Sequence, residues 1–252
     1  MKKIISLLLC LLLVSGLCAC GGETNQPGST GATEDVAYDP VNNDKTLKVL
    51  AIGNSFSDDT THFLEDIAKA EGFETVAIGN LYIGGCTLAT HVQNIQGNLA
   101  EYRFYMNYDG EWKIMENCTL EYALLHQDWD IITMQQASHD SGLPESYEIY
   151  LTKLIQYINE NKTNPKAKLA WNMTWAYQAD STHSAFPRYN NDQMTMYNAI
   201  VNAVKEKVVP HSEISYMIPA GTAIQNARPS YIGDNLTRDG CHINELGRVI
   251  TS

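Results

Sequence analysis

The sequence predicts an α/β fold in which a central parallel sheet of about five strands lies between two layers of helices. Short apolar runs of strand length alternate five times with segments whose apolar residues recur at helical spacing. The alternation itself predicts the arrangement, because strands that alternate with helices form parallel sheets with helices on both faces. At 252 residues, the chain is long enough for one sizeable domain of this class.

The first half of the pattern begins with a buried strand, Leu47–Gly53. We expect a helix after it, because apolar residues from Phe63 to Ala68 share one helical face, with Asp58 or Asp59 as its cap and Gly72 as its end. A second strand follows, in 74–85, and breaks at two glycines. A β-hairpin is then expected in 102–116, where Asp-Gly separates two alternating runs.

The second half continues the alternation. The expected strands are 130–136, 167–175 and 213–219, and the expected helices are 145–160, 193–208 and 220–227. The residues 241–252 begin a further helix that has no cap at Ser252. Either this helix ends raggedly or the sequence is a fragment, and we favour a fragment. In open parallel sheets, ligands bind beyond the C-terminal ends of the strands, which places Ser55, Gly85 and Gln136 on one edge.

The N-terminus indicates export. Residues 1–19 combine Lys2 and Lys3 with an apolar run that is long enough for a signal peptide and too short to span a membrane as a folded helix. The sequence LCACGG around Cys20 resembles a bacterial lipoprotein box, so we expect Cys20 to carry lipid and to hold the protein in the bacterial cell envelope, outside the cytoplasm. The alternative is an ordinary secretory signal with incidental cysteines.

Residues 20–45 are expected to be the lipidated cysteine and a flexible linker, because they contain hardly any apolar residues. The alternative is an irregular part of the fold. The predicted domain is thus 46–252. The net charge of the chain is −12, and it becomes −14 without Lys2 and Lys3. We therefore expect no nucleic-acid partner, and membrane contact through the N-terminal lipid alone.

Three cysteines remain in the domain, Cys86, Cys118 and Cys241, so at most one disulfide can join them. Cys86 and Cys241 adjoin candidate site residues, and they could pair, stay free or simply pack. None of the cysteines or histidines has the spacing of a metal site, and we expect no metal and no cofactor.

Gly53-Asn54-Ser55 ends a buried strand and opens a helix. A serine on such a tight turn is exposed, and the helix that follows directs its first N–H groups to the same place, as nucleophilic acyl transfer requires. The alternative is that the three residues are merely favourable turn formers.

A nucleophilic serine needs a histidine as base, held by a carboxylate. The spacing D-x-x-H occurs at Asp239 and His242, and again at Asp180 and His183. The spacing alone does not separate the two. Oxyanion donors are also needed, and Gly85 offers a backbone N–H while Gln135 and Gln136 offer side-chain amides, although buried glutamines can equally serve a structural role.

Four ordered blocks, GNS at 53–55, IGGCT at 83–87, QQ at 135–136 and DGCH at 239–242, resemble the SGNH or GDSL-like hydrolase superfamily. The resemblance spans the domain from Leu47 onwards and is closest to an uncharacterised lipoprotein branch. It implies a flavodoxin-like three-layer sandwich, with the hairpin as an insertion. It also favours the second D-x-x-H copy, because that block comes last in the superfamily.

Carried over, the resemblance implies Ser55 as nucleophile, His242 as general base and Asp239 as the residue that orients it. The N–H groups of Ser55 and Gly85 would form the oxyanion hole. The sequence departs from the pattern twice: Asn54 replaces the usual Asp, and a glutamine replaces the usual Asn of the third block. We expect Gln136 to be the amide donor, because strand alternation places it nearer the edge than Gln135.

These features predict an extracytoplasmic serine esterase that removes small O-acyl groups, acetyl above all, from carbohydrates through an acyl-enzyme. The partner would be an acylated glycan or another small ester. The alternative is a non-catalytic lipoprotein on the same fold that binds glycans or solutes. Four aromatic residues could stack on sugar rings or simply pack, namely Trp171, Trp175, Tyr177 and Tyr189.

Overall fold

The computed structural model describes residues 45–252. The expectations for the signal peptide 1–19, for Cys20 and for the linker up to residue 44 lie outside these residues. Within 45–252, none of the helices combines the length and the apolar character needed to cross a lipid bilayer.

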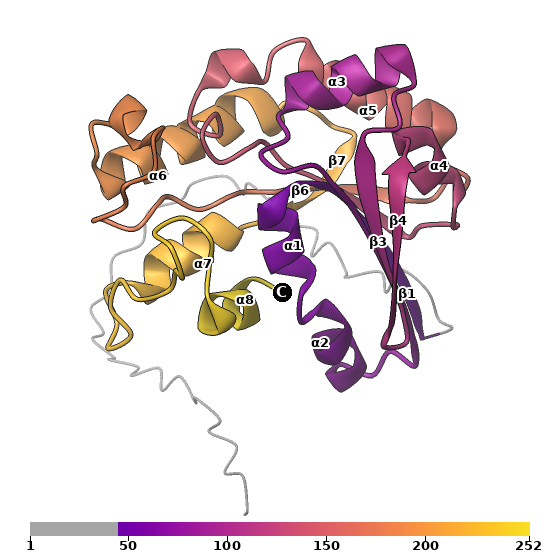
Figure 1. Cartoon of the computed structure of the whole chain (residues 1–252), viewed down its shortest axis with the longest axis horizontal. Coiled ribbons are helices and arrows are strands. Elements are labelled where there is room, and N and C mark those ends of the chain that lie inside the picture. The colour runs from indigo at the N-terminus through magenta and orange to yellow at the C-terminus, as the bar shows by residue number, and fades with distance from the viewer. Residues whose placement is uncertain (1–44) are drawn as a thin grey trace, which may run out of the picture. The chain divides into compact units, whose positions relative to one another are not determined.

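The centre of the fold is one seven-stranded sheet in the order β4-β3-β2-β1-β5-β6-β7 (Figure 1). Its strands are β1 (Thr46–Gly53), β2 (Thr75–Tyr82), β3 (Tyr102–Tyr108), β4 (Glu111–Cys118), β5 (Ile131–Met134), β6 (Lys168–Asn172) and β7 (Ile214–Ile218). Five of them, β2, β1, β5, β6 and β7, run parallel to one another. The α/β class predicted from the sequence is confirmed.

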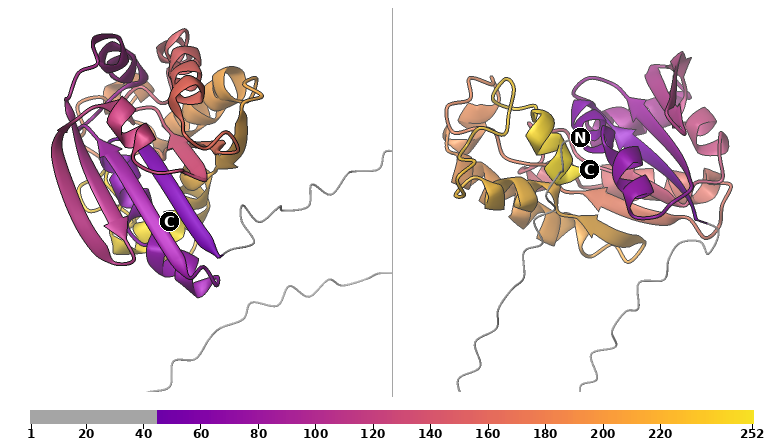
Figure 2. Two further views of the ribbon diagram at one scale, coloured as in Figure 1. Left: turned by 90° about the vertical axis from the view of Figure 1, so that its right-hand side faces the viewer. Right: turned by 90° about the horizontal axis from the view of Figure 1, so that it is seen from below.

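The sheet has seven strands and not about five, because the predicted hairpin joins it. Strand β3 pairs antiparallel with β2 and with β4, which places the hairpin at the outer edge (Figure 2). At its tip, Asp109 and Gly110 both have positive φ, of 50° and 90°. This is the backbone that tight hairpin turns need and that Asp-Gly adopts readily.

Helices cover both faces of the sheet. Figure 1 shows α3 (Leu88–Gly97), α4 (Leu120–Leu125), α5 (Tyr150–Asn161) and α6 (Gln193–Ala203) over one face. The other face carries α1 (Ser55–Thr61), α2 (Leu64–Ala70), α7 (Ala220–Ala227) and α8 (Glu245–Thr251). A π-helical turn, Val204–Val208, extends α6, and short 3₁₀ turns occur at Pro144–Ser146 and Phe186–Tyr189. This is the predicted three-layer sandwich.

Two local expectations were wrong or incomplete. The single helix expected up to Gly72 is two helices, and the first begins at Ser55 because Asn54, and not Asp58 or Asp59, accepts a hydrogen bond from the second residue's N–H. Helices α3 and α4 were not predicted. Each follows a threonine cap, Thr87 or Thr119, which is the signal that the sequence offered.

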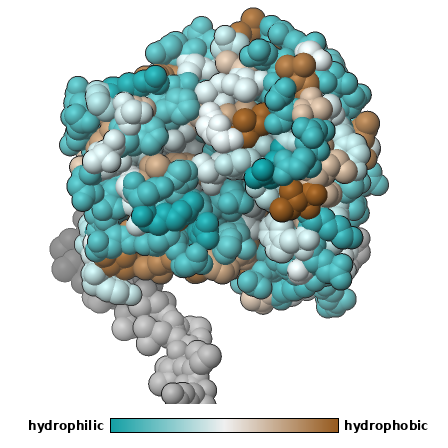
Figure 3. Space-filling view, in the orientation of Figure 1, coloured by the Kyte–Doolittle hydropathy of each residue, from teal (hydrophilic) through white to brown (hydrophobic). Residues whose placement is uncertain are grey.

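The main core lies between the sheet and its helices and is built from large apolar side chains on both. Trp129, Phe104, Leu154 and Ile158 are among those buried almost completely. In the orientation of Figure 1, the surface is largely hydrophilic, with apolar residues in small separate groups (Figure 3). The polar residues of interest gather instead where the parallel strands end.

Candidate active site

Ser55 is the first residue of α1, two residues after β1 ends. Asn54 holds this turn in place, because its Oδ1 accepts the Phe56 N–H at 3.0 Å and its Nδ2 donates to the Cys86 carbonyl at 3.1 Å. An aspartate could accept the first bond and could not donate the second. The exchange of the usual Asp for Asn54 therefore replaces a charge with a tie to the loop that follows β2.

His242 and Asp239 come to this serine from the far end of the sequence. The Nε2 atom of His242 lies 2.8 Å from the Ser55 Oγ, and its Nδ1 lies 2.7 Å from an Asp239 carboxylate oxygen. The structure therefore brings together the three residues that the resemblance implied. In this arrangement Nδ1 is the protonated ring nitrogen, and Nε2 is free to accept the serine proton.

Asp239 is held as a carboxylate by the turn that it begins. Burial opposes its ionisation, but hydrogen bonds from the His242 ring and from the N–H groups of His242 and Cys241 outweigh burial and lower the pKa of Asp239 well below its usual value. Those N–H groups donate to the second carboxylate oxygen at 2.7 and 3.0 Å. The orienting charge is therefore present throughout the neutral and mildly acidic range.

We expect this shift to appear in the stability of the protein. Because the pKa of Asp239 is lower in the folded than in the unfolded protein, its contribution is complete above the unfolded pKa and disappears as the pH falls through the folded pKa. The difference in unfolding free energy between the protein and Asp239→Asn should stay constant from about pH 7 to about pH 4 and narrow below that. Urea unfolding across this range measures it. A difference that widens in acid would contradict the assignment.

Two aromatic residues support the histidine. The Phe56 ring meets His242 edge to face, with centroids 5.7 Å apart, and stacks on Trp175 at 4.1 Å. The Trp175 Nε1 donates to the Cys241 carbonyl at 2.8 Å. Because Phe56 follows the nucleophile directly, the base rests on the same helix that presents the serine.

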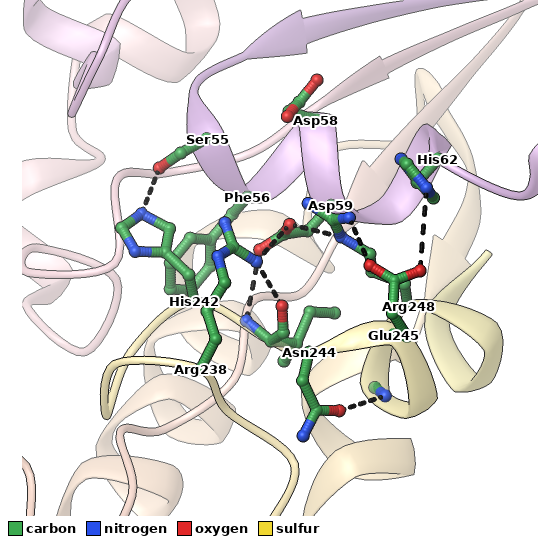
Figure 4. A network of polar contacts seen from close by, with 12 residues as sticks. Ser55, Phe56, Asp58, Asp59, His62, Arg238, His242, Asn244, Glu245 and Arg248 are labelled. Atoms are coloured by element: carbon green, nitrogen blue, oxygen red, sulfur yellow. Dashed lines mark hydrogen bonds and ion pairs between the residues drawn. The ribbon is translucent and has the colours of Figure 1, made fainter.

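Asp59 joins α1 to the C-terminal segment that carries Asp239 and His242 (Figure 4). Its fully buried carboxylate accepts hydrogen bonds from Arg238 at 2.8 Å and Arg248 at 2.9 Å, and from the Ile243 N–H at 3.2 Å. Arg238 and Ile243 flank the segment Asp239–His242, and Ser55 lies one helical turn before Asp59. A buried carboxylate on α1 therefore fixes the segment Asp239–His242 against the helix that begins at Ser55, a link that sequence reasoning missed.

The first D-x-x-H copy, Asp180 and His183, forms no comparable pair. The Nδ1 of His183 accepts the Ala185 N–H at 3.1 Å, so it cannot also take a proton-donating role toward Asp180. The His183 ring packs on Tyr177, with centroids 4.5 Å apart. Burial lowers the pKa of His183, and the nearby His139 and His242 lower it further. The choice of the second copy, which rested on the resemblance, agrees with this geometry.

The backbone donors expected for an oxyanion lie at adjacent strand ends. Gly53 pairs with Tyr82 at the ends of β1 and β2, which places Ser55 and Gly85 on neighbouring turns. Among residues 45–252, neither the Ser55 N–H nor the Gly85 N–H has a hydrogen-bond partner. Gly85 is exposed and has a φ of +64°, and a Cβ there would lie 4.0 Å from the His139 ring. Both N–H groups are therefore available to a ligand.

Gln136 does not fit its predicted role. Its Nε2 donates to the carbonyl and hydroxyl oxygens of Ser146, both at 3.0 Å, and its Oε1 accepts the N–H groups of Leu88 and Ala137. The amide is buried and both of its hydrogens are used. The prediction that Gln136 donates to the oxyanion was wrong, because the side chain turns inward to tie the loops after β2 and β5 together.

We expect Gln136→Ala to affect stability and not catalysis. The change leaves two buried N–H groups and a loop carbonyl without hydrogen-bond partners, which costs roughly 1–3 kcal/mol for each group. Urea unfolding should show the loss, while the kcat of the folded fraction changes less than about twofold. A large fall in kcat with normal stability would restore the oxyanion role.

Gln135 is also structural, and it supports the serine turn. Its Nε2 donates to the Asn54 Oδ1 at 2.9 Å, and its Oε1 accepts a hydrogen bond from Asn172 Nδ2 at 2.9 Å. Asn172 ends β6, so a chain of amides crosses three adjacent strand ends, β6, β5 and β1. This chain fixes the Asn54 cap and, through it, Ser55.

Asp239, Cys241 and His242 place three possible metal-ligand atoms within 4.8 Å of one another. The arrangement suits proton transfer better than metal binding. The Asp239 and His242 atoms already bond to each other, and burial raises the pKa of the Cys241 thiol to about 12, so the thiolate that a metal needs is not formed at neutral pH.

The other open questions from the sequence concern packing. The four aromatic residues Trp171, Trp175, Tyr177 and Tyr189 are buried, with at most 2% of their surface exposed, so they pack and do not present faces to a sugar. Cys86, Cys118 and Cys241 are buried and unpaired, so no disulfide joins them.

Residues 48–252 match the family described as a domain of unknown function, DUF4886. A crystal structure of a DUF4886 family protein from Bacteroides uniformis is 45% identical, with a TM-score of 0.77, over 81% of this chain and 78% of that one. No curated protein sequence matches.

The fold is that of SGNH/GDSL-like hydrolases. A candidate SGNH hydrolase from Slackia heliotrinireducens is similar at 18% identity and a TM-score of 0.51, over 82% of this chain and 95% of that one. A candidate GDSL-like lipase from Parabacteroides merdae is similar at 14% identity and a TM-score of 0.50, over 81% and 93%. At these identities the likeness concerns the fold alone.

Proposed function

The chain belongs to the DUF4886 family, and from its fold and its Ser55, His242 and Asp239 contacts we propose that it is a serine esterase. It would remove small O-acyl groups, acetyl above all, from carbohydrates. The observation that carries the proposal is the 2.8 Å contact between the His242 Nε2 and the Ser55 Oγ. At this distance His242 can take the Ser55 proton without a rearrangement of either side chain.

The reaction would proceed in two halves. His242 takes the Ser55 proton as the oxygen attacks the ester carbonyl, and the N–H groups of Ser55 and Gly85 hold the oxyanion. His242 then gives that proton to the departing alcohol, and the acyl group stays on Ser55. In the second half, His242 removes a proton from water, the hydroxide attacks the acyl-enzyme, and the acid leaves as Ser55 regains its proton.

The proposed setting is the bacterial cell envelope. The sequence of residues 1–19 and the box at Cys20 support a lipid-anchored protein that acts outside the cytoplasm. A surface glycan or a glycan from the surroundings would then be within reach. To test the anchor, the chain is expressed in a bacterial host. We expect globomycin to block removal of the signal peptide in the native chain, and this sensitivity to be lost in Cys20→Ser. Release as a soluble secreted protein would contradict it.

Hydrolysis of p-nitrophenyl acetate tests the activity. We expect steady turnover by residues 46–252 and a fall of at least about 10³-fold in Ser55→Ala, because the nucleophile is removed. A fluorophosphonate should label the protein and not the variant. The alternative, a non-catalytic glycan- or solute-binding lipoprotein, predicts sugar binding without turnover or labelling.

A further inference from the structure

A polar cavity lies beside the proposed triad. Its volume is about 260 Å³, and Asp239 forms part of its wall. The lining residues are Gln178, Asp180, Ser181, Thr182, Thr237, Arg238, Asp239 and Gly240. We call this space the hydroxyl cavity, because every lining residue except the glycine has a side chain that donates or accepts hydrogen bonds.

Hydrogen bonds connect the hydroxyl cavity to the proposed nucleophile. The Asp239 carboxylate in its wall is one imidazole away from Ser55, through contacts of 2.7 and 2.8 Å. Its opposite wall, the loop 180–182, packs against the catalytic turn, since a Cβ on Gly240 would lie 3.0 Å from the Ser181 Oγ. The φ of Gly240 is +88°, so the turn requires a residue without a side chain where the loop approaches.

The same loop connects to residues beside Gly85. His183 follows the loop and packs on Tyr177, whose hydroxyl lies 3.0 Å from the Ser138 Oγ. His139, the next residue, lies beside Gly85, since a Cβ on that glycine would be 4.0 Å from the His139 ring. A chain of neighbouring residues therefore links the loop 180–182, in the wall of the hydroxyl cavity, to Gly85, the proposed oxyanion donor.

The chemistry of the walls favours a ligand rich in hydroxyl groups. Hydroxyls, an amide and carboxylates in the walls include both donors and acceptors, which suits the ring hydroxyls of a sugar. The Arg238 guanidinium in the wall disfavours a metal cation. An apolar acyl chain would leave these groups without partners, at a cost in affinity.

We propose that the hydroxyl cavity binds the sugar ring of an acylated carbohydrate, so that Asp180 and Thr182 set a preference for sugar esters over simple esters. The inference rests on the proposed function. It gives the first D-x-x-H segment, 180–183, a role in binding in place of catalysis.

The test compares two substrates in matched variants. Asp180→Asn with Thr182→Val removes a charge and a hydroxyl from exposed positions with little change of shape. Ser184→Ala removes an exposed hydroxyl just outside the cavity and serves as the control. The substrates are an acetylated methyl glucopyranoside and p-nitrophenyl acetate, which has no sugar.

We expect the double variant to lower kcat/KM for the sugar acetate about ten- to a hundredfold and for p-nitrophenyl acetate less than about twofold, as lost hydrogen bonds to a bound sugar would. Ser184→Ala should change neither. An equal loss on both substrates, or no loss on either, overturns the inference while leaving the esterase proposal in place.

A second measurement needs no turnover. Ser55→Ala protein is titrated calorimetrically with the same sugar acetate, with and without the two cavity substitutions. Binding that weakens at least about tenfold with them supports the inference even if the native chain proves inactive, in which case the esterase proposal alone fails. Binding that is absent or unaffected overturns the inference.

Discussion

His242→Ala lowers the kcat for p-nitrophenyl acetate by about 10³-fold or more, and the double variant Ser55→Ala, His242→Ala is no slower than the worse single variant. The reason is that the two side chains share one proton across a 2.8 Å contact, so removing either disables the same step. Steady-state kinetics of the three variants, with circular dichroism to check folding, measure this.

His183→Ala is the matched control, because it removes the histidine of the other D-x-x-H segment. Its Nδ1 accepts a backbone N–H and no carboxylate orients it, so we expect kcat to change less than about tenfold. A larger loss of kcat in His183→Ala than in His242→Ala would show that His183, and not His242, is the base. Losses that multiply in the Ser55 and His242 double variant would show that the two act independently.

Asp59→Asn destabilises the fold by about 3–5 kcal/mol, the range for breaking a buried ion pair by removing one partner. The carboxylate is fully buried and bonds two arginines and one N–H, and the amide removes the negative charge that Arg238 and Arg248 share, leaving Arg248 with only the exposed Glu245 as an ionic partner within residues 45–252. The same change loosens the segment Asp239–His242 from α1. We therefore expect kcat to fall more than tenfold in the folded fraction, with KM nearly unchanged.

Glu245→Gln is the control for Asp59. It removes an exposed carboxylate from the same Arg248, bonded at 2.8 Å. Its other ion pair, 3.9 Å long, is with the exposed His62 that caps the C-terminal end of α1, and within residues 45–252 its carboxylate forms no hydrogen bond with the segment Asp239–His242. We expect a loss of at most about 1 kcal/mol and no change in kcat. Urea unfolding and kinetics well below the melting temperature separate the two effects. A destabilised Asp59→Asn with normal kcat would limit Asp59 to a structural role.

Local features of the fold could be predicted because their causes are local. The hairpin follows from Asp109-Gly110, which tolerates positive φ, and helix α7 was predicted with the bounds observed. The start of α1 could not be placed, since three polar residues could each cap it. The choice fell to Asn54 because its amide also meets Cys86 and Gln135, which are remote in sequence.

The candidate oxyanion donors also divide into one with a local cause and one whose contacts are remote in sequence. Gly85 could be proposed as a donor because a glycine at a strand end leaves its N–H open, and within residues 45–252 that N–H has no hydrogen-bond partner. Gln136 was assigned wrongly, because strand alternation gives the face on which a side chain starts but not the partners that compete for it. Ser146 and Leu88 lie on loops whose path only packing decides.

The sequence by itself determined the α/β class, the serine turn and the D-x-x-H turn, because each depends on hydrogen bonds and apolar spacing within a few residues. The spacing left the two D-x-x-H segments equivalent, and only the resemblance favoured 239–242. Tertiary structure brings this segment to Ser55, and it alone decided that the hairpin completes a seven-stranded sheet and that Asp59 ties α1 to the C-terminal turn. The physical reason is that these contacts join groups up to 189 residues apart, whose meeting depends on how every intervening element packs.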